Sequence, residues 1–159
     1  MSYQDWVFSV HLLFAATLVG GLFMSWVIVV ALYLTDAAEE TLALYRVETL
    51  GAVAILLGLF GTITLGIWLA ILRPQFHPWD GWVIGAIVLW AIATATVLRS
   101  FIEYQKPAAK ARELLAAGVT GPVAELKALN RTSTGLLLRV LSSITIVLIV
   151  IDMIYKPGA

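Results

Sequence analysis

The 159-residue sequence contains no cysteine, and only 13% of its residues are charged, whereas 61% are hydrophobic. The absence of cysteine excludes disulfide frameworks, thiolate metal sites, iron–sulfur clusters and cysteine nucleophiles. A soluble domain typically has about 25% charged and about 45–50% apolar residues. Ten basic and ten acidic side chains cancel, so no net positive field attracts nucleic acid, and we expect no such partner. The composition predicts a small integral membrane protein in contact with the lipid bilayer.

Charged residues are absent from long stretches of the chain, namely residues 6–34, 50–72, 81–98 and 140–151. A helix that crosses a bilayer needs about 20 mostly apolar residues, and the fourth stretch reaches that length over residues 134–155. The first stretch lacks a basic leader and exceeds a signal-peptide core, which favours a membrane helix. We predict an all-α, four-helix transmembrane bundle forming one membrane domain over residues 1–159. Its helices are expected at about 4–34, 48–72, 80–103 and 134–155.

Lysine and arginine are distributed unevenly between the two sides of the predicted membrane. The 35–49 and 99–133 loops hold seven basic residues, with Arg139 just inside the membrane edge, whereas the other side holds only Arg73 and Lys156. Cytoplasmic loops carry an excess of lysine and arginine. We therefore expect both termini on the non-cytoplasmic side and the two basic loops in the cytoplasm.

The long loop between the third and fourth membrane helices has helical signals of its own. Pro107 suits a helix start, and Gly118 suits the stop of a helix over residues 108–117. A second short helix is predicted over residues 123–129. Leucines on both segments are consistent either with helices along the membrane surface or with an ordinary solvated connector. Residues 36–39 resemble a helix N-terminus that leads into the second membrane helix.

Small residues recur every four positions in the first two membrane helices. These stripes are Thr17, Gly21 and Ser25 in the first helix and Gly58, Thr62 and Gly66 in the second. Small residues let membrane helices approach closely, so we predict a tight contact between these helices. Aromatic residues at the outer helix ends predict an interfacial belt, formed by Tyr3, Trp6, Trp68, Trp79, Trp82 and Tyr155.

His11 is the one ionisable residue well inside its uncharged run. Such residues are costly in lipid and invite a functional hypothesis. His11 can be an axial haem ligand, a metal ligand, or a hydrogen-bonding strut between helices, and we favour the strut. Asp152 lies at a similar depth and can orient His11 as a supporting partner, or it can pair with Lys156 one turn away. His77, between two prolines in a short loop, is expected to be solvated.

Charged side chains from three helices are expected at the cytoplasmic membrane edge, namely Arg46, Glu48, Arg99, Glu103 and Arg139. Such a ring could hold a propionate or a phosphate. Charged side chains at this depth usually extend to the interface and form surface ion pairs. We favour that second interpretation.

Three short motifs resemble known bacterial membrane proteins. His11-Leu12-Leu13 followed by Gly20-Gly21-Leu22 resembles the first-helix signature of a group that includes the copper-resistance D domain and the haem-containing membrane protoporphyrinogen oxidase. The stretches 64–69 and 152–157 are still more similar to an uncharacterised bacterial family of predicted four-helix integral membrane proteins. The resemblance implies the bacterial inner membrane, His11 as a suspected haem ligand, and Lys156-Pro157 as the group's C-terminal Lys-Pro.

The chain also departs from that group's pattern. Leu18 stands where an aromatic residue is often found, and Asn130-Arg131-Thr132 replaces an Asn-Glu motif. The outer surface is also not rich in methionine and histidine, as copper handling would require. The leading hypothesis is a non-enzymatic subunit or accessory factor of a membrane assembly, with other membrane subunits or a second copy as partners. The alternatives are a haem-b-binding redox protein with His11 as axial ligand, and a copper-handling membrane component.

Overall fold

The computed structural model describes residues 2–73, 75–77 and 79–156, and these fold into α-helices. The helices are α1 (Tyr3–Leu34), α2 (Ala38–Leu72), α3 (Gly81–Ala116), α4 (Ala124–Asn130) and α5 (Ser133–Tyr155). Four segments are long and apolar enough to cross a membrane. The prediction of an all-α four-helix bundle is confirmed, and the chain is an integral membrane protein.

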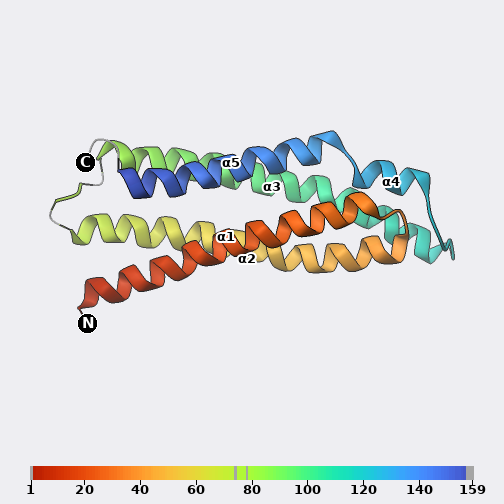
Figure 1. Ribbon diagram of the computed structural model, residues 1–159, viewed down its shortest axis with the longest axis horizontal. Helices are drawn as coiled ribbons and strands as arrows, with labels where there is room; N and C mark the ends of the chain where they lie inside the picture. The colour runs from red at the N-terminus through yellow and green to blue at the C-terminus, as the bar shows by residue number, and fades with distance from the viewer. Residues whose placement is uncertain (1, 74, 78, 157–159) are drawn as a thin grey trace.

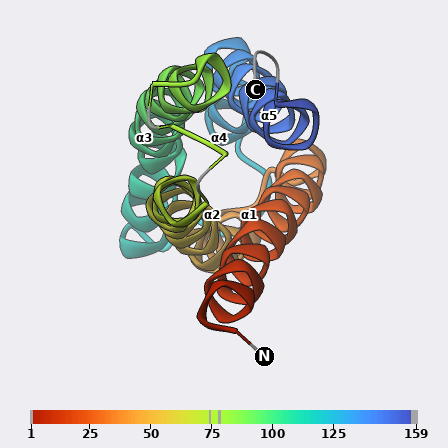
Figure 2. The same cartoon turned by 90° about the vertical axis from the view of Figure 1, so that its left-hand side faces the viewer.

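The four long helices run roughly along one axis (Figure 1). We call the end that holds Tyr3, the 73–80 loop and Tyr155 the terminal end. The opposite end, with the α1–α2 turn, the 117–123 loop and α4, is the loop end. Viewed along the bundle, α1 lies beside α2 and α3 beside α5, and contact between α2 and α3 joins the two pairs (Figure 2).

Two helices extend further toward the loop end than predicted. Helix α2 begins at Ala38 rather than near residue 48, which confirms the helix N-terminus predicted at residues 36–39. Helix α3 continues to Ala116 rather than ending near residue 103, so the helix predicted over residues 108–117 is its last part. Each is about 50 Å long at 1.5 Å per residue, which exceeds the hydrocarbon thickness of about 30 Å. Pro107 lies inside α3 and does not start a separate helix, which corrects our prediction. Gly118 has a φ of +70° just past the helix, as its predicted role as a stop requires.

The short helix predicted in the long loop is present as α4. Its Leu126 is fully buried and packs against Ala38 of α2 and Ala111 of α3. The amide Nδ2 of Asn130 also donates to Thr41 Oγ1 at 3.0 Å. The apolar face of α4 therefore covers the loop end of the bundle instead of lying along the membrane surface.

The predicted tight contact between α1 and α2 is confirmed, although Thr17 has no part in it. A Cβ atom built on Gly58 would lie 2.6 Å from Cα of Leu18, and one on Gly21 would lie 3.0 Å from Cβ of Ala54. Thr17 is exposed, and its hydroxyl donates to the carbonyl of Leu13. The contact follows the face of Leu18, Gly21 and Ser25, because residues three and four apart share a helix face.

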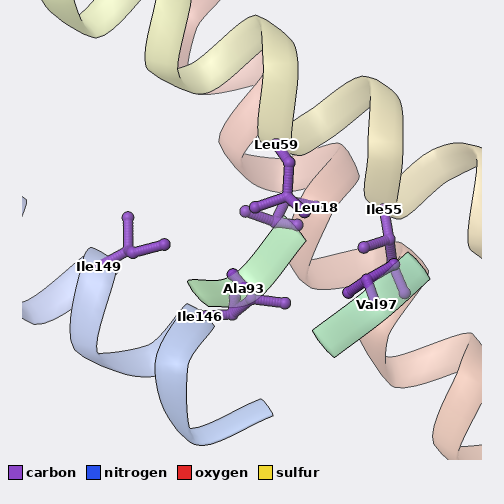
Figure 3. Close-up of a cluster of buried hydrophobic side chains, with 7 residues drawn as sticks. All are labelled: Leu18, Ile55, Leu59, Ala93, Val97, Ile146 and Ile149. Carbon is purple, nitrogen blue, oxygen red and sulfur yellow. The ribbon is translucent and has the colours of Figure 1, made fainter. Parts of the chain in front are cut away.

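A cluster of aliphatic side chains fills the middle of the bundle (Figure 3). All four long helices contribute to it, through Leu18, Ile55, Leu59, Ala93, Val97, Ile146 and Ile149. This layer separates the polar groups of the loop end from those of the terminal end.

The aromatic belt is present apart from one member. Tyr3, Trp6, Trp79 and Tyr155 are exposed at the terminal end, as expected for a membrane interface. Trp82 is buried instead, because the first turn of α3 points it inward, where it packs edge-on against Phe76 at 5.3 Å. The belt assignment of Trp82 is therefore wrong.

Candidate functional site

A buried ion pair links α2 to α5 near the loop end. Arg139 Nη2 donates to Glu48 Oε1 at 2.6 Å, and the two side chains are only 6% and 8% exposed. Ser25 Oγ of α1 donates to the same carboxylate oxygen at 2.6 Å. Our expectation that these two charges form surface ion pairs is wrong. Glu48 belongs to the inward face of α2 together with Tyr45 and Gly51, and a charge inside a membrane bundle needs a partner.

Of the remaining charges of the predicted ring, Arg46 and Arg99 are exposed, whereas Glu103 is buried beside its cationic partners. Arg99 is 62% exposed and pairs with Glu103 at 3.2 Å, and Lys106 contacts the same carboxylate. Arg46 is also exposed. The interfacial interpretation therefore holds for the Arg99–Glu103 pair, while Glu48 and Arg139 form a separate internal site.

A cavity of about 250 Å³ adjoins the ion pair. We call it the Arg139 pocket. Its polar lining consists mainly of Tyr45, Glu48, Ser100, Tyr104 and Arg139, with Arg46, Gln105 and Arg112 further along the wall. The guanidinium of Arg139 lies 4.7 Å from the centre of the Tyr104 ring, and Tyr45 packs against Tyr104 at 6.1 Å. The Tyr104 ring, itself packed against Tyr45, and the paired carboxylate thus hold Arg139 in place.

Four buried polar atoms in this pocket lack a hydrogen-bond partner among the described residues. They are Tyr45 Oη, Glu48 Oε2, Ser100 Oγ and Arg139 Nε. Leaving a buried polar group unpaired costs about 1–3 kcal/mol, so native structures rarely do so. The set contains an obligate donor, an obligate acceptor and two hydroxyls that can do either. It is complementary to a polar group that both donates and accepts hydrogen bonds.

The charge balance of the pocket is positive. Arg46, Arg112 and Arg139 face one carboxylate, Glu48, in the lining. Arg46 and Arg112 have no carboxylate within ion-pair distance in the described part of the chain. The pocket therefore favours a ligand whose polar group is electron-rich or anionic.

His11 and Asp152 lie in different helix pairs. His11 packs on Gly66 of α2, where an added Cβ would lie 3.4 Å from His11 Cε1. Asp152 faces Gly85 of α3, where an added Cβ would lie 3.3 Å from Asp152 Oδ1. Across the described residues, Asp152 has no hydrogen bond to His11 and no ion pair with Lys156, so neither expected pairing is formed. The reason is the rotation of each helix about its axis, which turns His11 toward α2 and Asp152 toward α3.

His11 instead lines a second cavity, of about 120 Å³, at the terminal end. We call it the terminal pocket. Pockets for drug-sized molecules measure about 300–1,000 Å³, and a haem is a larger ligand than most of these. The residues around His11 therefore do not fit a haem in this conformation. The described residues contain no group of three histidine, cysteine, aspartate or glutamate side chains that could hold a metal ion. His77 is exposed in its loop, as expected.

Comparison of the chain with protein-family models, with curated proteins and with solved structures finds no match in any of the three. The family resemblance of the short motifs therefore stays a prediction. Pro157, the second residue of the Lys156-Pro157 motif, lies outside the described residues.

Sequence reasoning missed several residues that line the two pockets. Tyr45, Ser100 and Tyr104 were not singled out, and neither was the inward position of Trp82. One usable signal was present, because Ser100 and Tyr104 are four residues apart and share a face with Val97. A stripe of polar residues that continues an apolar helix face indicates a buried polar site.

Proposed function

We propose that this integral membrane protein is a non-enzymatic subunit or accessory factor of a membrane assembly, and that it holds a small amphipathic molecule in the Arg139 pocket. One observation carries the proposal: four residues of α2, α3 and α5 that line the same cavity each have a buried polar atom without a partner among the described residues. A ligand that pairs with them would remove most of their desolvation cost.

The lining indicates how such a molecule would be oriented. Its polar group would accept from Arg139 Nε and donate to Glu48 Oε2. Its apolar part would lie against Ile55 and Val97, which belong both to the pocket wall and to the central aliphatic cluster. A polar head at the loop end with an apolar body toward the bundle centre is typical of an amphiphile taken up from the membrane.

Two conservative substitutions test this proposal. Tyr45→Phe and Ser100→Ala each remove a hydroxyl that has no partner among the described residues. We expect native mass spectrometry of the protein released from mild detergent to show a bound small molecule, whose occupancy falls about tenfold in each variant, as loss of about 1.4 kcal/mol requires. Thr17→Val, which removes an exposed hydroxyl far from both pockets, should leave occupancy unchanged.

The opposite result would refute the proposal. If the wild-type protein carries no small molecule and both variants unfold at higher temperature than wild type, the hydroxyls are simply unsatisfied groups. The pocket would then have no binding role.

The proposal extends to location and partners. With Arg139 inside the bundle, seven basic residues remain near the loop end against two at the terminal end. This bias supports a bacterial inner-membrane protein with both termini on the non-cytoplasmic side, so that the Arg139 pocket lies toward the cytoplasm. Another membrane subunit or a second copy would contact the exposed apolar faces.

The haem and copper alternatives remain predictions with their own tests. The haem alternative is favoured by the unpartnered Nδ1 of His11 and disfavoured by the small terminal pocket. An absorption spectrum of protein produced with haem available tests it, because a Soret band lost in His11→Ala would establish a haem protein. Copper titration of the same sample tests the third hypothesis.

A further inference from the structure

The terminal pocket contains a second group of unpartnered polar atoms, which the Arg139 pocket does not explain. His11, Thr62 and Trp82 all line this cavity. Their atoms Nδ1, Oγ1 and Nε1 are buried and lack partners among the described residues. Their side chains are at least nine-tenths buried. The indole nitrogen is a donor only, and the hydroxyl and the imidazole can both donate. The residues that carry these three potential donors therefore line one small space.

Two cations complete the lining of the terminal pocket, and aromatic rings hold both. The ammonium of Lys156 lies 4.4 Å from the centre of the Phe76 ring and 5.7 Å from that of Trp82. The guanidinium of Arg73 lies 5.9 Å from the centre of the Phe8 ring. Such contacts stabilise a cation in a defined position. The lining of the terminal pocket thus includes two cations, each held against an aromatic ring.

No carboxylate in the described part of the chain neutralises these cations. Neither Arg73 nor Lys156 forms an ion pair there. Asp152, one turn before Lys156, faces Gly85 and does not line the cavity. An acceptor-only ligand with negative charge would satisfy the donors and the cations together.

We propose that the terminal pocket binds a phosphate-class oxyanion through Arg73, Lys156, Trp82 Nε1 and Thr62. A volume of about 120 Å³ suits a single oxyanion and is too small for a macrocycle. Thr62 lies deeper, about 15 Å from the end of α2, whereas the outer part of the pocket, at Arg73 and Lys156, adjoins the exposed Tyr155, which marks the membrane–water interface. Lipid phosphates lie at this depth, so an anionic lipid headgroup is the favoured source of the oxyanion, and free phosphate is the other.

Lipid retention tests this site directly. The full-length protein is reconstituted in bilayers of phosphatidylcholine that contain one-tenth phosphatidylglycerol, extracted, and analysed by native mass spectrometry. We expect one phosphatidylglycerol retained per chain, with retention at least tenfold lower in Arg73→Gln and in Lys156→Gln. Arg99→Gln, which neutralises an exposed cation at the loop end, should retain the lipid as wild type does.

A second experiment distinguishes the two sources of the oxyanion, and a further variant controls for misfolding. Calorimetric titration of inorganic phosphate into protein in pure phosphatidylcholine bilayers should show weak binding that is lost in Lys156→Gln, whereas saturation at low phosphate would assign the site to the free ion. Thr62→Val keeps both cations and should still weaken retention, with unchanged helix content by circular dichroism. Equal phosphatidylglycerol retention in wild type and in the Arg73→Gln/Lys156→Gln double variant would overturn the proposal.

Discussion

The losses of stability caused by substituting Glu48 and Arg139 separately should not add up in the double variant, because the two residues form a buried ion pair. Arg139→Met removes the 2.6 Å bond to Glu48 Oε1. Within the described part of the chain it leaves that carboxylate with Ser25 as its only partner, because Oε2 has none there. Removing one member of a buried ion pair costs about 3–5 kcal/mol, since a buried charge is left uncompensated. Glu48→Met should cost a similar amount, because it leaves the guanidinium of Arg139 buried beside the Tyr104 ring.

The double variant Glu48→Met/Arg139→Met should be more stable than either single variant. It removes both charges and leaves only the Ser25 hydroxyl without its partner, at a cost of about 1–3 kcal/mol. If the two single costs added, the double variant would lose about 6–10 kcal/mol. We therefore expect a non-additivity of at least about 3 kcal/mol, which is the signature of direct contact.

Reversible unfolding in mixed micelles of mild detergent and SDS, followed by circular dichroism, measures this cycle. Arg99→Met is the matched control, because Arg99 is 62% exposed and Glu103 keeps Lys106 as a partner. An exposed pair contributes about 0–1 kcal/mol. Additive losses in the double variant would refute the reasoning, because they would mean that Glu48 and Arg139 do not stabilise each other.

Three further predictions concern packing and orientation. Gly58→Ala should lower stability by about 1–3 kcal/mol in the same assay, because its Cβ would lie 2.6 Å from the backbone of α1. Gly20→Ala should be neutral or stabilising by up to about 1 kcal/mol, because a Cβ added there meets no atom within 4 Å. A larger loss of stability in Gly20→Ala than in Gly58→Ala would contradict the close contact of α1 with α2 at Gly58. Leu126→Ala should lower local stability by about 2–5 kcal/mol and speed proteolysis of the 117–123 loop, whereas unchanged proteolysis would show that α4 is not held by this side chain. Because the chain has no cysteine, Gln75→Cys should react with an impermeant maleimide in spheroplasts and Thr120→Cys only after lysis, and the opposite pattern would invert the proposed topology.

Part of the candidate site could be predicted from the sequence, and part could not. Glu48 and Arg139 were singled out as charges near the membrane edge, but they are 91 positions apart, and hydropathy does not reveal that they face each other. His11 and Asp152 were singled out for the same reason, and their depths along the helices were compatible with contact. The rotation of α1 and α5 about their axes prevents that contact, since His11 packs on α2 and Asp152 on α3.

The sequence by itself determined that this is a helical membrane protein with four spans and a close contact between the first two. Those properties depend on residues that are close together in the sequence. A run of about 20 apolar residues is enough to form a membrane span, and a four-residue repeat of small side chains lets one helix approach another closely. Only the tertiary structure decided which polar groups share a cavity. That outcome depends on the rotation of each helix about its axis and on its neighbours, so Trp82 and Glu48 point into the bundle although their positions alone favoured the interface.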